Sequence, residues 1–364
     1  MKIAFLFDIF NERGGAERNA IIMAKNIDLD IYTTFVDWNK VDEELREFDI
    51  KELGLTFKNH KLLTYSEIAY RFSKLKLKGY DFYIFSRLYC ISGAKNHHPN
   101  MWLCHSPIRA VYDLHDSIYN RLSLWQKPIF KTWCWIYKKY DKEWVRNFDK
   151  IISNSNNTAA RLKSFYGLES KVIHHPIETE RFKCKNFEDF YFAPSRLVKE
   201  KRIDLIIEAF KEMPDKKLII TGDGPERKSL ENLARGCKNI KLLGSVDYEK
   251  VIELYSRCTA TIYMPINEDY GLVPIESMAS GKPCIAANEG GPKETIIHGK
   301  TGFLIKADKE EIKKWVNYLT PEVARKMKND CLKRAKEFNV NIFIQNIKKT
   351  INEVIKNENI RYRL

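Results

Sequence analysis

Residues 267–296 read NEDYGLVPIESMASGKPCIAANEGGPKETI, and they join a glycine-opened helix to two carboxylates. Glu268 and Glu276 are separated by seven residues. We expect Glu268 in the loop before the helix and Glu276 one to two turns inside it, so one carboxylate can face a sugar and the other a ribose. Backbone N–H groups at the start of a helix are free to bind phosphate or sugar oxygens. Those groups belong to Gly271, Leu272 and Val273.

Strands and helices are predicted to alternate on both sides of this stretch, which is typical of parallel sheets covered by helices. In the first half, the expected strands are at 2–7, 81–86, 101–104 and 150–153. In the second half, they are at 189–195, 216–222, 239–244, 259–264 and 282–287. Helical periodicity fills the gaps, as at 202–213 and 310–319. The pattern predicts an α/β fold.

The length and composition fit two folded domains. The chain has 364 residues, of which 44% are hydrophobic and 12% are aromatic. No apolar run approaches the ~18–20 residues that cross a bilayer, and no signal-peptide pattern opens the chain. We therefore expect a cytoplasmic protein with reduced cysteines. A formal net charge of +14 leaves nucleic acid, an anionic membrane and phosphate-bearing small molecules as partners.

A break in the pattern divides the chain in two. Residues 174–188, HHPIETERFKCKNFE, combine a proline and mixed charge without a sustained period, and a new strand follows. We place an interdomain linker there. The predicted parts are an N-terminal Rossmann-like domain at 1–176, a C-terminal one at 177–340 and a terminal amphipathic helix at 341–364 that packs back toward the first domain.

Basic residues in the first strand–loop–helix of the second domain are candidates for phosphate binding. Arg196 supplies a planar fork of donors and Lys201 a point charge, and both could reach one pyrophosphate. Lys199 and Arg202 compete with Lys201 for this role. Basic residues before a helix are also often simply solvated.

Glycine turns are a second kind of candidate. Gly14 and Gly15, after the first strand, let the backbone bend sharply near a ligand, and the next helix would aim its N–H groups there. Such a pair also occurs in turns that bind nothing. Gly222 and Gly224, in TGDGPER (221–227), fit a loop close to a ligand, although a tight surface turn is the favoured interpretation.

His105 follows an expected strand end, where open α/β sheets place their ligands. It can hydrogen-bond a sugar hydroxyl or polarise a leaving group, and a purely structural histidine fits about equally well. Asp28 and Asp30 superficially form a metal-binding D-x-D. They stand apart from every other motif, so we interpret them as surface charge.

These motifs together resemble glycosyltransferase family 4. The stretch at 267–296 is similar to the E-x7-E signature of that family, and the glycine turn, His105, the Arg196/Lys201 pair, the GDGP turn and the GGPKE turn follow in family order. The segments CHSPIRAVYD (104–113) and GGPKET (290–295) look most like the mannosyltransferase-like members that build surface polysaccharides. The resemblance implies the GT-B fold, in which two Rossmann-like domains face each other across a donor-binding cleft.

The resemblance also implies roles for single residues. His105 and Glu268 would act at the transferred sugar, and Glu276 would grip the ribose. The donor diphosphate would be held by Gly14, Gly15, Arg196, Lys201, Gly271, Leu272 and Val273. One departure from the family is that Asp269 and Tyr270 follow Glu268, where a small residue and an aromatic are usual. Further candidates for sugar or base contacts are Asp269, Tyr270, Gly222 and Gly224.

The implied activity is retaining transfer of a hexose, with mannose favoured, from a nucleotide-diphosphate sugar to a glycan or a lipid-linked glycan. GDP-mannose is the favoured donor. No metal or other cofactor is expected, because two cations and a helix N-terminus can stabilise the leaving diphosphate. A sugar-nucleotide epimerase on the same scaffold is the alternative. A nucleic-acid-binding protein is disfavoured, because the chain offers no recognised binding module.

Residues 121–150 form a basic, aromatic stretch. They carry eight Lys or Arg against three Asp or Glu, and four tryptophans. On a helical projection, one face is basic and another is apolar. The basic face holds Lys127, Lys131, Lys138, Lys142 and Arg146, and the apolar face holds Ile129, Trp133, Ile136, Tyr140 and Trp144.

Such a helix suits the surface of an anionic membrane. The favoured alternative packs the aromatic face onto the core of the first domain and leaves the lysines in water, where they can still attract a membrane. We therefore expect a place at the inner membrane face as a peripheral protein.

Overall fold

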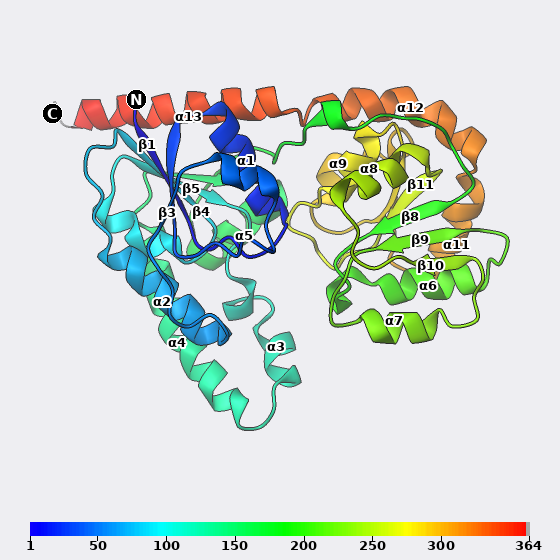
Figure 1. Ribbon diagram of the computed structural model, residues 1–364, viewed down its shortest axis with the longest axis horizontal. Coiled ribbons are helices and arrows are strands. Elements are labelled where there is room, and N and C mark those ends of the chain that lie inside the picture. The colour runs from blue at the N-terminus through cyan, green and yellow to red at the C-terminus, as the bar shows by residue number, and fades with distance from the viewer. Residues whose placement is uncertain (362–364) are drawn as a thin grey trace. The chain divides into compact units, whose positions relative to one another are not determined.

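The computed structural model describes residues 1–361, with side chains through residue 358. The chain forms two compact units. Among the described residues, unit 1 holds Met1–His174 together with residues 343–361, and unit 2 holds His175–Ile342. Each unit is a parallel sheet with helices on its faces (Figure 1).

The sheet of unit 1 has seven strands in the order β3-β2-β1-β4-β5-β6-β7, and all neighbours pair in parallel. Every residue of the three central strands β1, β4 and β5 is buried, which explains their continuous apolar sequences. The strands are β1 (Ile3–Phe7), β2 (Leu29–Thr33), β3 (Ile50–Glu52), β4 (Phe82–Ser86), β5 (Asn100–Cys104), β6 (Lys150–Ser153) and β7 (Lys171–Val172).

Helices cover both faces of this sheet. Helices α1 and α13 lie along one face, and α2 and α4 lie on the other (Figure 1). The core beneath α2 and α4 includes Phe72, Phe85 and Trp102. The elements are α1 (Gly15–Asn26), α2 (Lys61–Lys74), α3 (His115–Arg121), α4 (Gln126–Val145), α5 (Asn156–Tyr166) and α13 (Val340–Arg361), with short 3-10 helices η2 (Cys90–Asn96) and η3 (Arg109–Val111).

The sheet of unit 2 has six parallel strands in the order β10-β9-β8-β11-β12-β13. Helix α6 shows how the helices attach, since its buried residues recur every three or four positions at Ile203, Ile206, Ile207 and Phe210. The strands are β8 (Tyr191–Pro194), β9 (Leu218–Thr221), β10 (Ile240–Leu242), β11 (Ala260–Tyr263), β12 (Cys284–Ala287) and β13 (Gly302–Ile305). The helices are α6 (Ile203–Lys211), α7 (Arg227–Leu233), α8 (Tyr248–Arg257), α9 (Val273–Ala279), α10 (Pro292–Thr295), α11 (Lys309–Tyr318) and α12 (Pro321–Lys336).

The stretch predicted as a linker, residues 174–188, packs almost entirely onto unit 2. Phe182 and Phe187 are buried in the core of this unit, and Ile177 forms a parallel bridge with Asn339. The two units divide between His174 and His175. This segment was predicted as a linker because its sequence lacks a sustained period. It packs onto unit 2 because burying its two phenylalanine rings is favourable.

The interpretation of 121–150 as a helix with its aromatic face in the core is wrong in part. The core-facing side of α4 instead carries Phe130, Cys134, Tyr137, Asp141 and Val145. Trp133 and Trp144 are half-buried at its margin, whereas Ile129, Ile136 and Tyr140 are 53%, 44% and 49% exposed. Among the described residues, no helix combines the length and apolarity needed to span a membrane.

Candidate functional site

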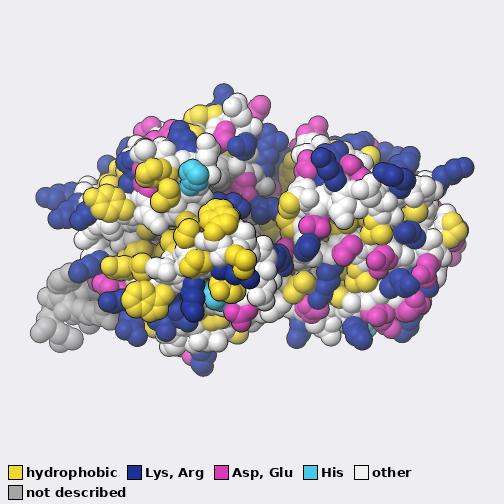
Figure 2. Space-filling view, turned by 90° about the horizontal axis from the view of Figure 1, so that it is seen from below, with side chains coloured by type: hydrophobic (Ala, Val, Ile, Leu, Met, Phe, Trp, Pro, Cys, Tyr) yellow, Lys and Arg dark blue, Asp and Glu magenta, His cyan; other side chains and the backbone are white. Residues whose placement is uncertain are grey.

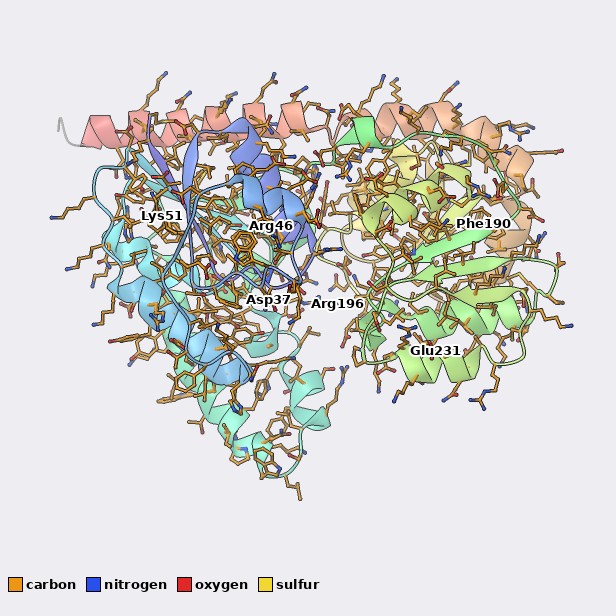
Figure 3. All side chains as sticks on the ribbon, viewed as in Figure 1. Asp37, Arg46, Lys51, Phe190, Arg196 and Glu231 are labelled. Carbon is orange, nitrogen blue, oxygen red and sulfur yellow. The ribbon has the colours of Figure 1, made fainter. Side chains whose placement is uncertain are left out.

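The strand order of unit 2 reverses between β8 and β11, since β8 connects toward β9 and β11 toward β12. Open α/β sheets bind ligands at such a switch point, outside the carboxyl ends of the strands. Figure 3 marks the two ends of β8, with Phe190 immediately before it and Arg196 just beyond it. The loops that follow β8 and β11 therefore define the candidate site of this unit.

Lys201 and Glu268 meet at this switch point. The Lys201 Nζ lies 2.6 Å from the Glu268 Oε2 and donates a second hydrogen bond to the Tyr263 hydroxyl at 3.1 Å. Their side chains are only 19% and 26% exposed. A short, charge-assisted hydrogen bond in partly dry surroundings holds both groups in place. The site thus offers one cation and one carboxylate at the edge where a ligand would enter.

The other basic candidates lie differently. Arg202 adopts a left-handed backbone conformation (φ 49°) and pairs with Glu289 at 2.8 Å. Lys199 and Arg196 have exposed side chains. Lys201, Lys199 and Arg202 were the candidates for binding the same pyrophosphate, and Lys201 is the one in contact with Glu268.

Glu276 is held by two phenols. Its Oε1 accepts a hydrogen bond from Tyr248 and its Oε2 accepts one from Tyr255, both at 2.8 Å. Burial raises the pKa of Glu276, and the two hydroxyl donors partly oppose this effect. The carboxylate is therefore oriented before any ligand arrives, with lone pairs left for additional donors.

The helix that carries Glu276 starts slightly later than predicted. Its first residue is Val273, so Glu276 lies in the first turn. Gly271 has a φ of +85°, and a Cβ there would come within 3.0 Å of the Tyr263 ring. Among the described residues, the N–H groups of residues 271–273 have no hydrogen-bond partner. They can serve oxygen ligands.

The quoted stretch folds back on itself. Gly290 has a φ of +59°, and a Cβ there would lie 2.2 Å from the carbonyl oxygen of Glu268. Gly291 would similarly clash with the backbone of Tyr270, and its N–H donates to the Glu268 carbonyl at 2.9 Å. The two glycines let the GGP turn support the Glu268 loop from behind.

The structure does not favour the predicted ligand contact of Tyr270. Its side chain is 3% exposed in the core of unit 2, and its hydroxyl donates to the His175 carbonyl at 3.0 Å. Burial of an aromatic ring stabilises the folded unit. The buried ring of Tyr270 thereby anchors the Glu268 loop. Asp269 is half-buried and stays a predicted sugar contact.

Gly222 and Gly224 allow two loops to touch. A Cβ on Gly222 (φ +116°) would lie 1.9 Å from the carbonyl oxygen of Ser195, and one on Gly224 would lie 2.3 Å from that of Leu197. The Leu197 N–H donates to the Asp223 carbonyl at 2.9 Å. The glycines thus fix the Arg196 loop against the turn after β9, which supports the interpretation as a tight turn.

In unit 1, His105 follows β5 and bonds to a serine at the end of β4. Its Nε2 lies 2.7 Å from the Ser86 Oγ, and its carbonyl accepts from the Asn154 amide at 2.8 Å. Gly14 caps α1 and Gly15 opens it. All of these residues lie at carboxyl ends of strands, and the order of this sheet reverses between β1 and β4.

A buried charge network braces this switch point. Asp8, just after β1, accepts hydrogen bonds from the N–H groups of residues 88–90, and its burial raises its pKa. Arg87, with a φ of 93°, pairs with the buried Glu17 of α1 at 2.8 Å. The network joins the loops after β1 and β4 to the helix that follows Gly14 and Gly15.

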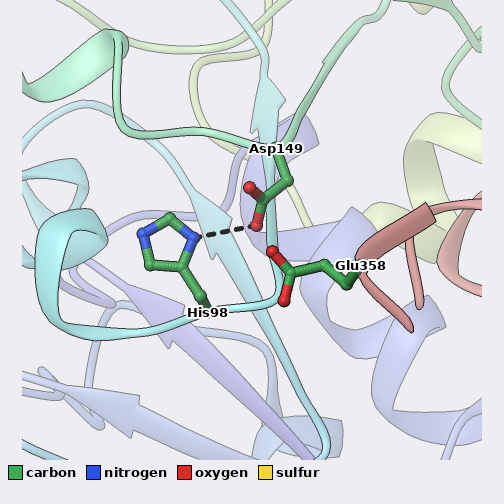
Figure 4. Close-up of side chains that lie close together, drawn as sticks. All are labelled: His98, Asp149 and Glu358. Carbon is green, nitrogen blue, oxygen red and sulfur yellow. Dashed lines mark hydrogen bonds and ion pairs between the residues drawn. The ribbon is translucent and has the colours of Figure 1, made fainter. Parts of the chain in front are cut away.

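Two other features lie at the opposite, amino-terminal edges of the sheets. His98, Asp149 and Glu358 gather in unit 1, with ligand atoms within 4.8 Å of one another and the His98 Nδ1 at 2.9 Å from Asp149 (Figure 4). In unit 2, a cavity of about 440 Å³ is bordered by Asp189 and Lys217. Neither belongs to the switch-point sites.

Comparison with known proteins finds a similarity in the second unit. The family described as "Glycosyl transferases group 1" matches residues 177–338. This match covers nearly all of unit 2 and less than half of the chain. The matched residues include Lys201, Glu268 and Glu276.

Relatives and solved structures extend the comparison. An uncharacterized glycosyltransferase of Methanocaldococcus jannaschii is 29% identical over 47% of this chain and 50% of its own. The α-1,3/1,6-mannosyltransferase ALG2 of Homo sapiens is 27% identical over 46% and 50%. The chain thus spans about half the length of these curated relatives.

HepE of Anabaena, solved with UDP and glucose, matches with a TM-score of 0.75 at 20% identity over 97% of this chain and 99% of its own. This likeness concerns the fold. The prediction of an α/β chain with two GT-B-type, Rossmann-like sheets is confirmed.

Four residues that position the candidate site residues were not predicted from the sequence. Tyr248 and Tyr255 hold Glu276, Tyr263 contacts Lys201, and Ser86 contacts His105. Ser86 ends the predicted strand at 81–86, and Tyr263 is the second-last residue of the predicted strand at 259–264. Their places near the ligand edge could therefore have indicated them.

Proposed function

We propose that this chain is a retaining glycosyltransferase that moves a hexose, with mannose favoured, from a nucleotide-diphosphate sugar to a glycan or lipid-linked glycan acceptor. The observation that carries the proposal is the contact between Lys201 and Glu268 at the switch point of unit 2. The N–H groups of residues 271–273, which have no hydrogen-bond partner in the described part of the chain, and the oriented carboxylate of Glu276 belong to the same stretch. The match to the group 1 family supports the reaction class.

Different residues bind different parts of the donor. Lys201, Arg196 and the helix amides neutralise the diphosphate, and Glu276 accepts hydrogen bonds from ribose hydroxyls. A diphosphate that binds Lys201 competes with its bond to Glu268, which leaves that carboxylate available to sugar hydroxyls. His105 offers its ring to the transferred sugar.

The chemical step breaks the bond between the anomeric carbon and the diphosphate oxygen, and the electron pair leaves with the diphosphate. The acceptor hydroxyl attacks the same face, and its proton passes to a leaving-group oxygen. Fixed cations and amides stabilise the negative charge that develops on this oxygen, so we propose a reaction without a metal.

GDP-mannose is the proposed donor, and the match to ALG2 supports mannose. The acceptor is proposed to be carried by a lipid at the inner face of a membrane. The basic excess of the chain, +14 overall, suits such an anionic surface.

The test uses a panel of GDP-, UDP-, ADP- and dTDP-sugars in the presence of EDTA. One nucleotide class should raise the melting temperature of the wild type, and Lys201→Ala or Glu276→Ala should remove this shift. Lys199→Ala, two residues from Lys201 and exposed, is the matched control. A shift that survives in both site variants would contradict the donor site.

Product analysis tests the reaction itself. Proton NMR of the product should show the anomeric configuration of the donor. Inversion, or activity that requires an added divalent cation, would contradict the mechanism. Donor that is epimerised without any acceptor would favour the epimerase instead.

A further inference from the structure

The hairpin formed by α3 and α4 exposes large apolar side chains at its tip and along α4. Leu124 and Trp125, in the connection between the helices, are 85% and 68% exposed. Farther along α4, Trp135 is 73% exposed. Side chains of this size normally lie in a core or an interface, so such a group on a surface indicates a binding function.

These side chains follow helical geometry. At 100° per residue, Trp125, Ile129, Ile136 and Tyr140 fall within about 60° of one another. Trp133 borders this row, and its indole N–H donates to the Ser66 hydroxyl of α2 at 3.2 Å. The apolar row of α4 therefore continues onto a neighbouring helix.

Helix α2 adds two apolar residues to the same area. Leu63 and Tyr70 are 49% and 62% exposed, and they lie on the helix face that includes Ser66. We call the combined area the aromatic ridge. It consists of Leu63, Tyr70, Leu124, Trp125, Ile129, Ile136 and Tyr140.

Lysines border the aromatic ridge. Lys139 is exposed on α4, about 40° from Trp125 on the same projection. On α2, the Lys74 Nζ lies 5.8 Å from the centroid of the Tyr70 ring. Of the acidic residues of α4, Glu143 is exposed on the same side as the apolar row, whereas Asp141 is buried and accepts hydrogen bonds from Tyr112 and Tyr166. Figure 2 shows yellow side chains gathered among dark-blue ones on the face of unit 1 that α2, α3 and α4 form.

This combination selects a lipid bilayer with anionic headgroups as the occupant. Tryptophan and tyrosine favour the boundary between headgroups and acyl chains, and lysines beside them attract anionic lipid. A bound nucleic acid would explain the lysines but not the aliphatic Leu63, Ile129 and Ile136. The lysines and the apolar side chains together are thus complementary to an anionic surface with an apolar layer beneath it.

The ridge is mechanically linked to the ligand edge of unit 1. Tyr137, on the core side of α4, donates to the carbonyl of Leu88 in the loop after β4 at 3.3 Å. Helix α4 also packs against η3, which follows the His105 loop. A lipid surface that contacts α4 would therefore lie close to the loops that hold Ser86 and His105.

We propose that the aromatic ridge docks this chain onto an anionic lipid bilayer, with Trp125, Ile129 and Ile136 entering the headgroup boundary. The inference deepens the proposed function, because it assigns the surface through which a lipid-linked acceptor is approached. Binding to lipid is nevertheless measurable without any sugar transfer.

The test is flotation of the full chain with vesicles of phosphatidylcholine alone or mixed with phosphatidylglycerol. The wild type should float with the anionic vesicles, and high salt should weaken this binding. The double variant W125A/I129A should bind them at least about tenfold more weakly, because two exposed apolar anchors are removed. A charge variant, K74Q/K139Q, should lose most of the preference for the anionic vesicles.

Tyr318→Ser is the matched control, since Tyr318 is 55% exposed in unit 2, and it should float like the wild type. Equal flotation of W125A/I129A and the wild type would overturn the proposal. A wild-type dimer that this variant converts to a monomer, without lipid binding by either, would also overturn it, because the ridge would then join two copies. Donor-induced melting shifts, measured on the same variants, separate either failure from a failure of the proposed function.

Discussion

Tyr255→Phe isolates the hydrogen bond that orients Glu276. Tyr255 is fully buried, and its hydroxyl lies 2.8 Å from the Glu276 Oε2. The phenylalanine ring can keep the packing against Phe182 and Phe192 while the donor is lost. A hydrogen bond to a charged group contributes about 1.5–3 kcal/mol to the free energy of unfolding.

For a unit of this size, that loss corresponds to a melting temperature lower by about 3–12 °C. The affinity for the donor nucleotide should fall about tenfold or more, because the carboxylate is no longer held toward the ribose. Differential scanning calorimetry and titration calorimetry measure the two effects. Tyr248→Phe is the comparison, and its loss should be smaller because the half-buried Tyr248 can be replaced by water.

The pH dependence provides an independent check. Burial raises the pKa of Glu276 above its usual value, so the folded unit binds this proton more tightly than the unfolded chain does. This group therefore adds stability as the pH falls through the folded pKa, and the contribution is absent above it. Donor binding needs the ionised carboxylate and should weaken over the same range. Tyr255→Phe should move that weakening to higher pH, and a variant that melts and binds like the wild type would refute the role assigned to Tyr255.

Three further changes test other parts of the account. Ser86→Ala should lower kcat about tenfold, with little change in donor affinity, because the 2.7 Å contact that orients His105 is lost; steady-state kinetics would contradict this if kcat were unchanged. Gly222→Ala should destabilise unit 2 by about 1–3 kcal/mol, since the new Cβ would meet a carbonyl oxygen at 1.9 Å, and urea denaturation would show it. His98→Gln should remove a contribution to stability that is complete below about pH 6.5 and lost as the pH rises through the folded pKa, which Asp149 raises. Equal melting of the two proteins from pH 5 to 8 would exclude that contribution.

Much of the fold could be predicted because the central strands are continuous apolar runs. The expected strand at 189–195 contains β8, and the expected helix at 202–213 contains α6. Strands β3, β7 and β13 were not predicted. Strands β3 and β7 have only three and two residues, and all three lie at an edge of their sheet. Strands β3 and β7 also lack the buried run that marks a central strand.

The site was predictable where its residues are close in sequence. Glu268 and Glu276 could be placed on one loop and helix because Gly271 and Leu272, between them, indicate where the helix opens. The phenols that hold Glu276 could not, because Tyr248 and Tyr255 lie 28 and 21 residues away on another helix. The role of Tyr270 could not be predicted although it is close to Glu268 in sequence, since nothing in its local sequence distinguishes a buried anchor from a ligand contact.

The most direct test of the account is titration calorimetry of the preferred nucleoside diphosphate in EDTA, with the wild type, Lys201→Ala and Lys199→Ala. The account predicts that Lys201→Ala binds at least about tenfold more weakly, since a charge-assisted contact is lost, whereas Lys199→Ala binds like the wild type. Equal affinities of the wild type and Lys201→Ala would contradict the claim that the Lys201 and Glu268 contact marks the donor diphosphate site.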